Sequence, residues 1–308
     1  MNNFTQEYVK IRDIEQYFVI YPKDSKKLVL HLHGGPGESE APFLYRLIPE
    51  ERDYIFVTYD QRGTGRTQDR NKSKPEDVTF ETLLEDLHET VRYLIKRFNP
   101  DTFVLYGHSW GTVLGCEYVH RHPLMVDCLV CEGQVVNVPT EERTAYEHLK
   151  EIISEKDRPK LDSLKDFDFC FSKPENLKKL MLFRKLENKY GMAGISKDGP
   201  SPFSIIIKSP LFRLKDLFMS MNSVMKTSGN LLKAVDCFDV RNHTEYLIPY
   251  FLVCGKNDWQ TPYVCAEEYY NTVSAPKKHI YWQEGGHSSS ADHPEQFKKT
   301  IEDIFNRL

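Results

Sequence analysis

The chain alternates between short apolar segments and longer amphipathic ones, except in one central stretch. The short segments are rich in β-branched and aromatic residues and are bounded by turn residues; they cover 17–21, 28–32, 54–59, 102–106, 128–131, 250–254 and 279–282. This length and composition predict strands of a mostly buried sheet. Between them, apolar residues recur at the spacing of a helix face, as at Leu87, Val91 and Leu94 and at Ile301 and Ile304. Strands alternating with helices predict an α/β fold, with a mostly parallel central sheet flanked by helices on both faces.

From about residue 135 to residue 245 the strand rhythm stops and the pattern is helical. Apolar periodicity covers 146–153, 177–190 and 211–225, and Gly and Pro cluster between these segments, as at 197–202. A helical block between two strands predicts an inserted cap over the carboxyl edge of the sheet, where ligands bind in open α/β sheets. We therefore predict a core in two parts, residues 1–134 and 246–308, separated by a helical cap at 135–245.

Composition excludes several classes of protein. With 308 residues, 40% of them hydrophobic and 28% charged, the chain can bury a large core. A net charge of -4 and a pI of about 6.3 give no basic footprint for nucleic acid, so we predict no nucleic-acid partner. The N-terminus is polar, and no apolar run approaches the roughly 20 residues that span a bilayer. We expect a cytoplasmic protein that does not bind membranes; the sequence leaves its oligomeric state open.

The seven cysteines are an odd number and lie mostly in apolar segments, which predicts buried free thiols in a reducing compartment. Cys128 and Cys131 form a C-x-x-C pair, but a zinc site needs further ligands, and the chain has no second pair at zinc spacing. We expect neither a metal nor a cofactor.

The candidate chemistry begins with Gly-His-Ser-Trp-Gly at 107–111, a G-x-S-x-G sequence centred on Ser109. A serine between a strand and a helix needs a sharp turn, and glycines two residues to either side leave room for it. An apolar strand precedes the motif and an amphipathic helix follows it. This context favours a nucleophile elbow over an ordinary Gly-Ser turn.

A serine hydroxyl needs a base to remove its proton, and the base needs a third group to hold its tautomer. Asp258 follows the strand at 250–254 and His287 follows the strand at 279–282. Serine, acid and histidine in this chain order, each after a strand, predict a catalytic triad. Alone, Asp258 is equally suited to capping a turn, and His293 is a weaker candidate for the base because it sits where the last helix begins.

A developing oxyanion needs two backbone N–H donors. The segment His-Gly-Gly-Pro-Gly at 33–37 follows a strand, and we assign the donors to the amides of Gly35 and Trp110. A third glycine-bearing loop, at 60–67, lacks the spacing of a phosphate-binding motif. We expect it to brace the pocket through Asp60 and Arg62.

These motifs, at 33–37, 60–65 and 107–111, together with the late Asp258 and His287, resemble the prolyl aminopeptidase (proline iminopeptidase) family of α/β hydrolases. The likeness covers the core on both sides of the insertion. It implies the α/β-hydrolase fold with a helical cap, the triad and oxyanion hole above, no metal, and release of an N-terminal residue, often proline, from small peptides.

The family binds the substrate amine through cap glutamates in W-E-G-x-T-like and E-N-H-Y-F-like segments, and residues 135–245 contain neither segment. Glu132 and Gln134 follow the strand at 128–131 instead. Glu132 could pair with a substrate ammonium, and Gln134 could bind a carbonyl or brace the cap; alternatively, both satisfy backbone groups at the strand end.

Three functions remain open. The first is an aminopeptidase for short peptides or small amides, the second a carboxylesterase or lactonase with the same machinery, and the third a binding protein on a hydrolase scaffold. Retention of Ser109, Asp258 and His287 together argues against the third.

Overall fold

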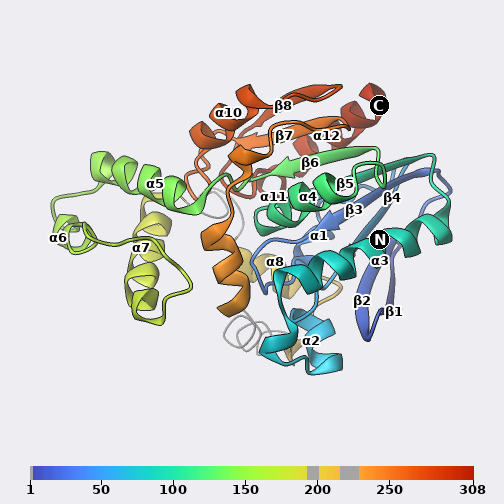
Figure 1. The fold of residues 1–308 in the computed structure, drawn as a ribbon, viewed down its shortest axis with the longest axis horizontal. Helices are drawn as coiled ribbons and strands as arrows, with labels where there is room; N and C mark the ends of the chain where they lie inside the picture. The colour runs from blue at the N-terminus through green and yellow to red at the C-terminus, as the bar shows by residue number, and fades with distance from the viewer. Residues whose placement is uncertain (1–2, 193–200, 216–228) are drawn as a thin grey trace.

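The computed structural model describes residues 3–192, 201–215 and 229–308. Its centre is an eight-stranded sheet in the order β1-β2-β4-β3-β5-β6-β7-β8 (Figure 1). The pairs β1/β2 and β2/β4 are antiparallel, and every other pair is parallel. The strands are β1 (Thr5–Ile11), β2 (Ile14–Tyr21), β3 (Lys27–Leu32), β4 (Ile55–Tyr59), β5 (Thr102–His108), β6 (Cys128–Glu132), β7 (Tyr250–Gly255) and β8 (Lys278–Gln283).

The seven predicted strands and the mostly parallel sheet are confirmed, whereas β1 has no counterpart among the predictions. It is an edge strand, joined to β2 by a tight turn at Arg12 and Asp13. Only Val9 and Ile11 of its side chains are buried, so its apolar signal is short and lies within a polar run. The prediction missed it because one face and one edge of this strand are left to solvent.

Helices cover both faces of the sheet. In β3, Leu28 and Leu30 pack toward one helical layer, whereas Val29 packs toward the other. The first layer contains α3 (Phe80–Phe98), α4 (Trp110–Arg121) and α10 (Tyr263–Thr272), and the second contains α1 (Ala41–Leu44) and α12 (Pro294–Arg307). The short helices α2 (Gly65–Asn71) and α11 (Ser289–Asp292), with the 3-10 turns η1 (Pro75–Asp77) and η3 (Val240–Asn242), complete the core.

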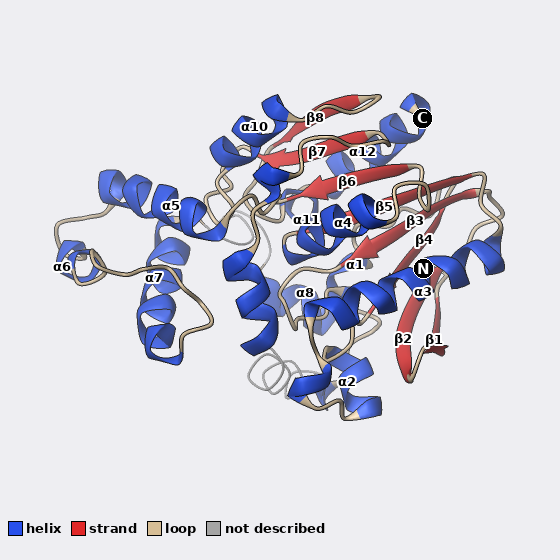
Figure 2. Cartoon of the chain, viewed as in Figure 1, coloured by secondary structure: helices blue, strands red, loops and turns tan. Residues whose placement is uncertain are grey.

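The insertion between β6 and β7 is helical, as predicted, and stands at the carboxyl ends of the parallel strands (Figure 2). It contains α5 (Val138–Ile152), α6 (Arg158–Asp162), η2 (Pro174–Asn176), α7 (Leu177–Tyr190), α8 (Pro202–Lys208) and a helical segment at 229–237. The first helices have their own small core around Leu149, Phe169 and Phe183. The periodicity at 146–153 falls largely on α5 and that at 177–190 on α7, whereas most of 211–225 lies outside the described residues.

All seven cysteines are free thiols, and five of them are buried, as predicted. In the described part of the chain, no helix combines the length and the apolarity that a membrane crossing requires.

Candidate active site

Ser109 lies in a strained turn between β5 and α4, with φ 51° and ψ -118°. Such a backbone is costly for a residue with a side chain and persists only where the surroundings enforce it. The glycines of the motif make the turn possible. A Cβ on Gly111 would lie 2.1 Å from the carbonyl oxygen of Leu32, and one on Gly107 would lie 2.6 Å from that of Gly111. The turn therefore has the elbow geometry that the sequence predicts.

Asp258 and His287 meet at the same edge of the sheet. The Nδ1–H of His287 donates to Oδ2 of Asp258 over 3.0 Å, and both side chains are buried. The other oxygen of Asp258 accepts from the backbone N–H groups of Gln260 and Thr261, each over 3.0 Å. Asp258 thus caps a turn with one oxygen and orients a histidine with the other, so the two functions weighed for it coexist.

The second nitrogen of the His287 ring is buried and has no hydrogen-bond partner among the residues that the structure describes. Because Nδ1 faces a carboxylate, we assign the ring proton to Nδ1, which leaves the lone pair on Nε2. Ser109 lines the same cavity, although no hydrogen bond joins its hydroxyl to Nε2 in this structure. The ring lies close to the backbone at Gly133, where a Cβ would be 2.8 Å from Cε1.

The glycine loop, residues 33–37, lies against the nucleophile. A Cβ on Gly34 would be 3.3 Å from Cβ of Ser109. Gly35 has φ 116°, a conformation that favours glycine. Trp110 is the first residue of α4, where backbone N–H groups lack intrahelical acceptors. Both assigned oxyanion donors therefore come from segments next to Ser109.

The loop is braced by Gln61, which sequence reasoning did not single out. Its backbone N–H donates to Nε2 of His33 over 3.1 Å, its side-chain amide donates to the carbonyl of His33 over 3.3 Å, and its Oε1 accepts from the Trp110 indole over 3.0 Å. One side chain thus connects the glycine loop to the residue after the nucleophile.

Neither Asp60 nor Arg62 lines the cavity, but Asp60 forms a hydrogen bond with Ser39, which does, so the predicted bracing holds for Asp60 and not for Arg62. Arg62 forms ion pairs with Asp13 and Asp86 and so ties the β1–β2 turn to α3. Asp60 accepts from the backbone N–H of Arg66 at the start of α2.

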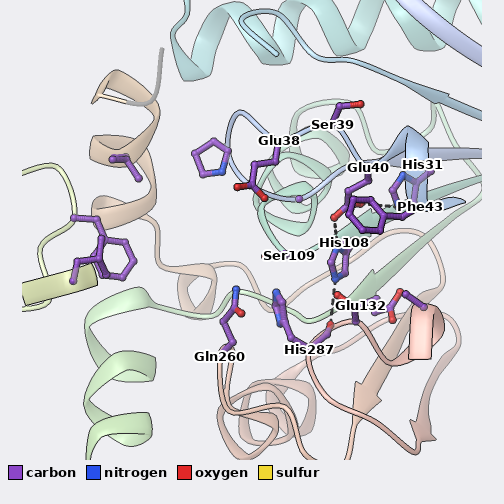
Figure 3. A pocket seen from close by; sticks show the side chains of 18 of the residues that line it. His31, Glu38, Ser39, Glu40, Phe43, His108, Ser109, Glu132, Gln260 and His287 are labelled. Atoms are coloured by element: carbon purple, nitrogen blue, oxygen red, sulfur yellow. Dashed lines mark hydrogen bonds and ion pairs between the residues drawn. The ribbon is translucent and has the colours of Figure 1, made fainter. Parts of the chain in front are cut away.

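A cavity of about 750 Å³ opens between the sheet edge and the cap (Figure 3). Ser109, His287 and Gly35 line it from the core. A largely apolar wall comes from α1 and its surroundings and from the cap, and consists of Phe43, Leu44, Leu47, Phe171, Leu177, Leu180 and Leu232. The volume is within the usual range for small-molecule sites.

Glu132 reaches this cavity, but the protein already satisfies its carboxylate. One oxygen accepts from the Tyr106 hydroxyl over 2.6 Å, and the other accepts from the Ser290 backbone N–H over 2.8 Å and the Ser289 hydroxyl over 3.1 Å. Gln134 is not among the cavity-lining residues; its Oε1 accepts from the Tyr250 hydroxyl over 3.0 Å. These contacts favour structural roles at the end of β6 for both residues.

His108, between Gly107 and Ser109, forms a buried bridge that sequence reasoning missed. Its Nδ1–H donates to Glu40 over 2.6 Å and its Nε2–H donates to the carbonyl of His287 over 3.2 Å, so the ring holds two protons (Figure 3). Burial alone disfavours the imidazolium, but the Glu40 carboxylate outweighs it and raises the pKa of His108 to about 10. Burial opposes the charge of Glu40 as well, yet His108 lowers the pKa of that carboxyl to about 2.

The second oxygen of Glu40 lies 3.4 Å from Nε2 of His31. Burial lowers the pKa of His31 to about 4, so this ring is neutral at physiological pH. No spacing rule links residues 31, 40 and 108; the only available signal was the presence of polar side chains beside the glycine loop and inside the elbow.

Comparison with known proteins shows which fold this architecture belongs to. Residues 27–155 match the family model described as the alpha/beta hydrolase fold. The crystal structure of a proline iminopeptidase from Mycobacterium smegmatis superposes with a TM-score of 0.73 over 98% of each chain, at 15% identity. The predicted fold class is confirmed: the protein is an α/β hydrolase.

The similarity in sequence is more specific. A Bacillus subtilis protein named "Probable aminopeptidase YbaC" is 24% identical over 95% of this chain and 93% of its own length. A proline iminopeptidase of Heyndrickxia coagulans is 25% identical over 91% of each chain. The resemblance carried by the motifs is therefore confirmed: over almost its whole length the chain is similar to proteins named as aminopeptidases of this kind, and it is an enzyme of the serine hydrolase class.

Proposed function

We propose that this enzyme releases an N-terminal residue, proline or a similar small residue, from short peptides or amides. Ser109 is the nucleophile, His287 the general base, Asp258 its orienting acid, and the amides of Gly35 and Trp110 form the oxyanion hole. The observation that carries the proposal is the His287 ring, which is held by Asp258 on one side and presents an unpartnered Nε2 on the other, in the cavity that Ser109 also lines.

The mechanism follows from this arrangement. His287 Nε2 takes the Ser109 hydroxyl proton as Oγ bonds to the substrate carbonyl carbon, and the negative oxygen is held by the two amides. The C–N bond then breaks, and the imidazolium returns its proton to the leaving amine. Water attacks the resulting ester of Ser109, again with His287 as base, and releases the acid and the free hydroxyl.

A free amine on the substrate is favoured by the charges around the cavity. Among the described residues that line it, three are carboxylates, namely Glu38, Glu40 and Glu132. The cationic groups His108 and Lys173 are already paired, with Glu40 and Asp168 respectively. The unbalanced charge is negative, and it attracts a cationic substrate over a neutral or anionic one. The names of the curated relatives agree with this preference.

The apolar wall supports a second candidate, a carboxylesterase or lactonase. Leucine and phenylalanine side chains suit an acyl chain as well as a prolyl ring, and the same machinery cleaves esters more readily than amides. In both cases the enzyme binds a small molecule or a short peptide. We propose that it acts in the cytoplasm, as expected from its sequence.

Steady-state kinetics separate the candidates. We would compare kcat/KM for prolyl and alanyl 4-nitroanilides, the N-acetylated prolyl anilide and a short-chain nitrophenyl ester. We expect the free-amine anilides to be cleaved and acetylation to abolish the cleavage. Ester turnover without anilide cleavage would select the esterase.

Ser109→Ala is the control for the chemistry. We expect kcat to fall by roughly 10⁴-fold to 10⁶-fold on every substrate, with the urea unfolding curve unchanged, because the hydroxyl contributes chemistry and little packing. Substantial turnover by this variant would overturn the assignment of the nucleophile.

A further inference from the structure

The carboxylates around the site differ in whether other groups of the protein form hydrogen bonds or ion pairs with them. Asp258 binds His287, Glu40 binds His108, and Glu132 accepts three hydrogen bonds. Glu38 also lines the cavity, but no described residue forms a hydrogen bond or ion pair with its carboxylate. It is therefore the one carboxylate among these four with its full capacity left for a ligand.

Glu38 is placed by the glycine loop. The chain folds back after Gly35, so that the backbone nitrogen of Glu38 lies 3.0 Å, and its Cβ 3.7 Å, from the position a Gly35 Cβ would occupy. Its side chain thus starts beside the residue whose amide we assign to the oxyanion hole. In Figure 3 the carboxylate faces the open cavity, toward the side where Gln260 and His287 lie.

An aminoacyl substrate needs an acceptor at this place. Its α-nitrogen is two bonds from the carbonyl carbon, a separation of about 2.5 Å. A charge-assisted N–H···O contact adds about 2.8 Å. The acceptor must therefore lie within roughly 5 Å of the carbon that Ser109 attacks. Glu38 follows directly on the glycine loop to which we assign an oxyanion donor, and it lines the same cavity as Ser109.

We propose that Glu38 binds the α-ammonium group of the substrate and so selects substrates with a free N-terminus. The inference rests on the proposed aminopeptidase function and gives that function its amine receptor. Glu38 is solvent-exposed as a residue, yet desolvation by the surrounding protein first, and the charge of Glu40 second, raise the pKa of its carboxyl above the usual value. A bound ammonium relieves both effects, because it supplies the missing opposite charge.

The test compares Glu38→Gln with Glu175→Gln. Glu175 is exposed in η2, beside the cavity-lining Pro174, and does not line the cavity itself, so it controls for the loss of one negative charge near the entrance. In Glu38→Gln we expect kcat/KM for alanyl and prolyl 4-nitroanilide to fall about 10-fold to 100-fold, the effect of losing a hydrogen bond to a charged group. The kcat/KM for 4-nitrophenyl acetate, which has no amine, does not fall, and Glu175→Gln stays near wild type on all substrates.

The outcomes separate this inference from the function on which it rests. If the wild type hydrolyses only the ester, the aminopeptidase function fails and the amine receptor fails with it. If the wild type cleaves the anilides and Glu38→Gln cleaves them equally well, the inference alone is overturned. A parallel loss on anilides and ester in Glu38→Gln also overturns it, because that result means that the substitution distorts the glycine loop.

An inhibition experiment checks the inference without anilide turnover. Prolinamide should inhibit ester hydrolysis by the wild type, and its inhibition constant should rise at least 10-fold in Glu38→Gln, again as expected for a charged hydrogen bond. N-Acetylprolinamide, which has no ammonium group, should show no such difference between the two enzymes. Equal inhibition of both enzymes by prolinamide would contradict the inference.

Discussion

The ion pair between Glu40 and His108 joins two loops of the site, because His108 also donates to the carbonyl of His287. Glu40→Gln removes the charge of the pair while it keeps the shape of the side chain and one acceptor. Without the carboxylate, burial is opposed only by the charge of Glu132 and by the hydrogen bond to the carbonyl of His287, so the pKa of His108 falls and the ring loses its second proton more easily. The neutral ring then has one N–H for two acceptors.

The loss of unfolding free energy in Glu40→Gln can be estimated from these contacts. Removing one partner of a buried ion pair costs about 3–5 kcal/mol when the remaining charge cannot be neutralised. His108 can release its proton, and the glutamine keeps a neutral hydrogen bond, so we expect a loss of about 2 kcal/mol of unfolding free energy at neutral pH.

The direction in which stability changes with pH follows from the shifted pKa values of His108 and Glu40. The folded pKa of His108, about 10, lies above 6.5, so its stabilisation is complete below pH 6.5 and is lost as the pH rises through 10. Glu40 has a folded pKa of about 2, below its ordinary 4.5, so its stabilisation is present above pH 4.5 and lost as the pH falls through 2. The difference between wild type and variant is therefore largest between pH 4.5 and 6.5 and shrinks toward pH 10.

Urea unfolding at pH 6, at pH 8 and at the folded pKa of about 10 measures this difference directly. Glu38→Gln is the matched control, since it neutralises a neighbouring carboxylate without a partner, and we expect it to change stability by less than about 0.5 kcal/mol. A Glu40→Gln deficit of equal size at the three pH values would refute the ion pair as its cause.

Two further predictions concern packing around the site and in the cap. Gly133→Ala places a Cβ 2.8 Å from the ring of His287, at a backbone φ of 57°. Because this contact displaces the base, we expect kcat to fall roughly 100-fold. A kcat near that of the wild type, in a variant that keeps its circular dichroism spectrum, would contradict this. Arg184→Leu removes the ion-pair partner of the buried carboxylates of Glu142 and Glu187, and we expect a loss of about 3 kcal/mol in urea unfolding. A loss below about 1 kcal/mol would mean that the two carboxyls are protonated together in the folded cap.

The parts of the site that could be predicted are those with a local signature. The elbow at Ser109 needs glycines on both sides within five residues of sequence, so its geometry is visible there. Asp258 and His287 each follow a strand, and the carboxyl ends of parallel strands meet at one edge, so loop position alone brought them to the same region. The structure places both there, joined by a hydrogen bond.

The parts that could not be predicted depend on contacts between distant segments. Glu132 is held by Ser289 and Ser290, more than 150 residues away in the chain, and no pattern near residue 132 announces that contact. Gln134, two residues on, turns to Tyr250 instead of the cavity. That Gln61, and not one of its neighbours, braces the glycine loop depends on the direction in which its side chain points. A turn-rich loop has no hydrophobic periodicity from which such a direction can be predicted.

The charges near Ser109 constrain the chemistry as well as the binding. Glu40 and His108 cancel one another, whereas Glu38 adds a negative charge beside the place where the oxyanion develops. Two like charges at close range oppose each other, so an unpaired Glu38 works against the transition state. A substrate ammonium bound to Glu38 removes that opposition while it positions the carbonyl, and its benefit therefore reaches kcat as well as KM. An ester without an amine receives no such benefit, and for this reason the loss of the Glu38 charge is not expected to slow its hydrolysis.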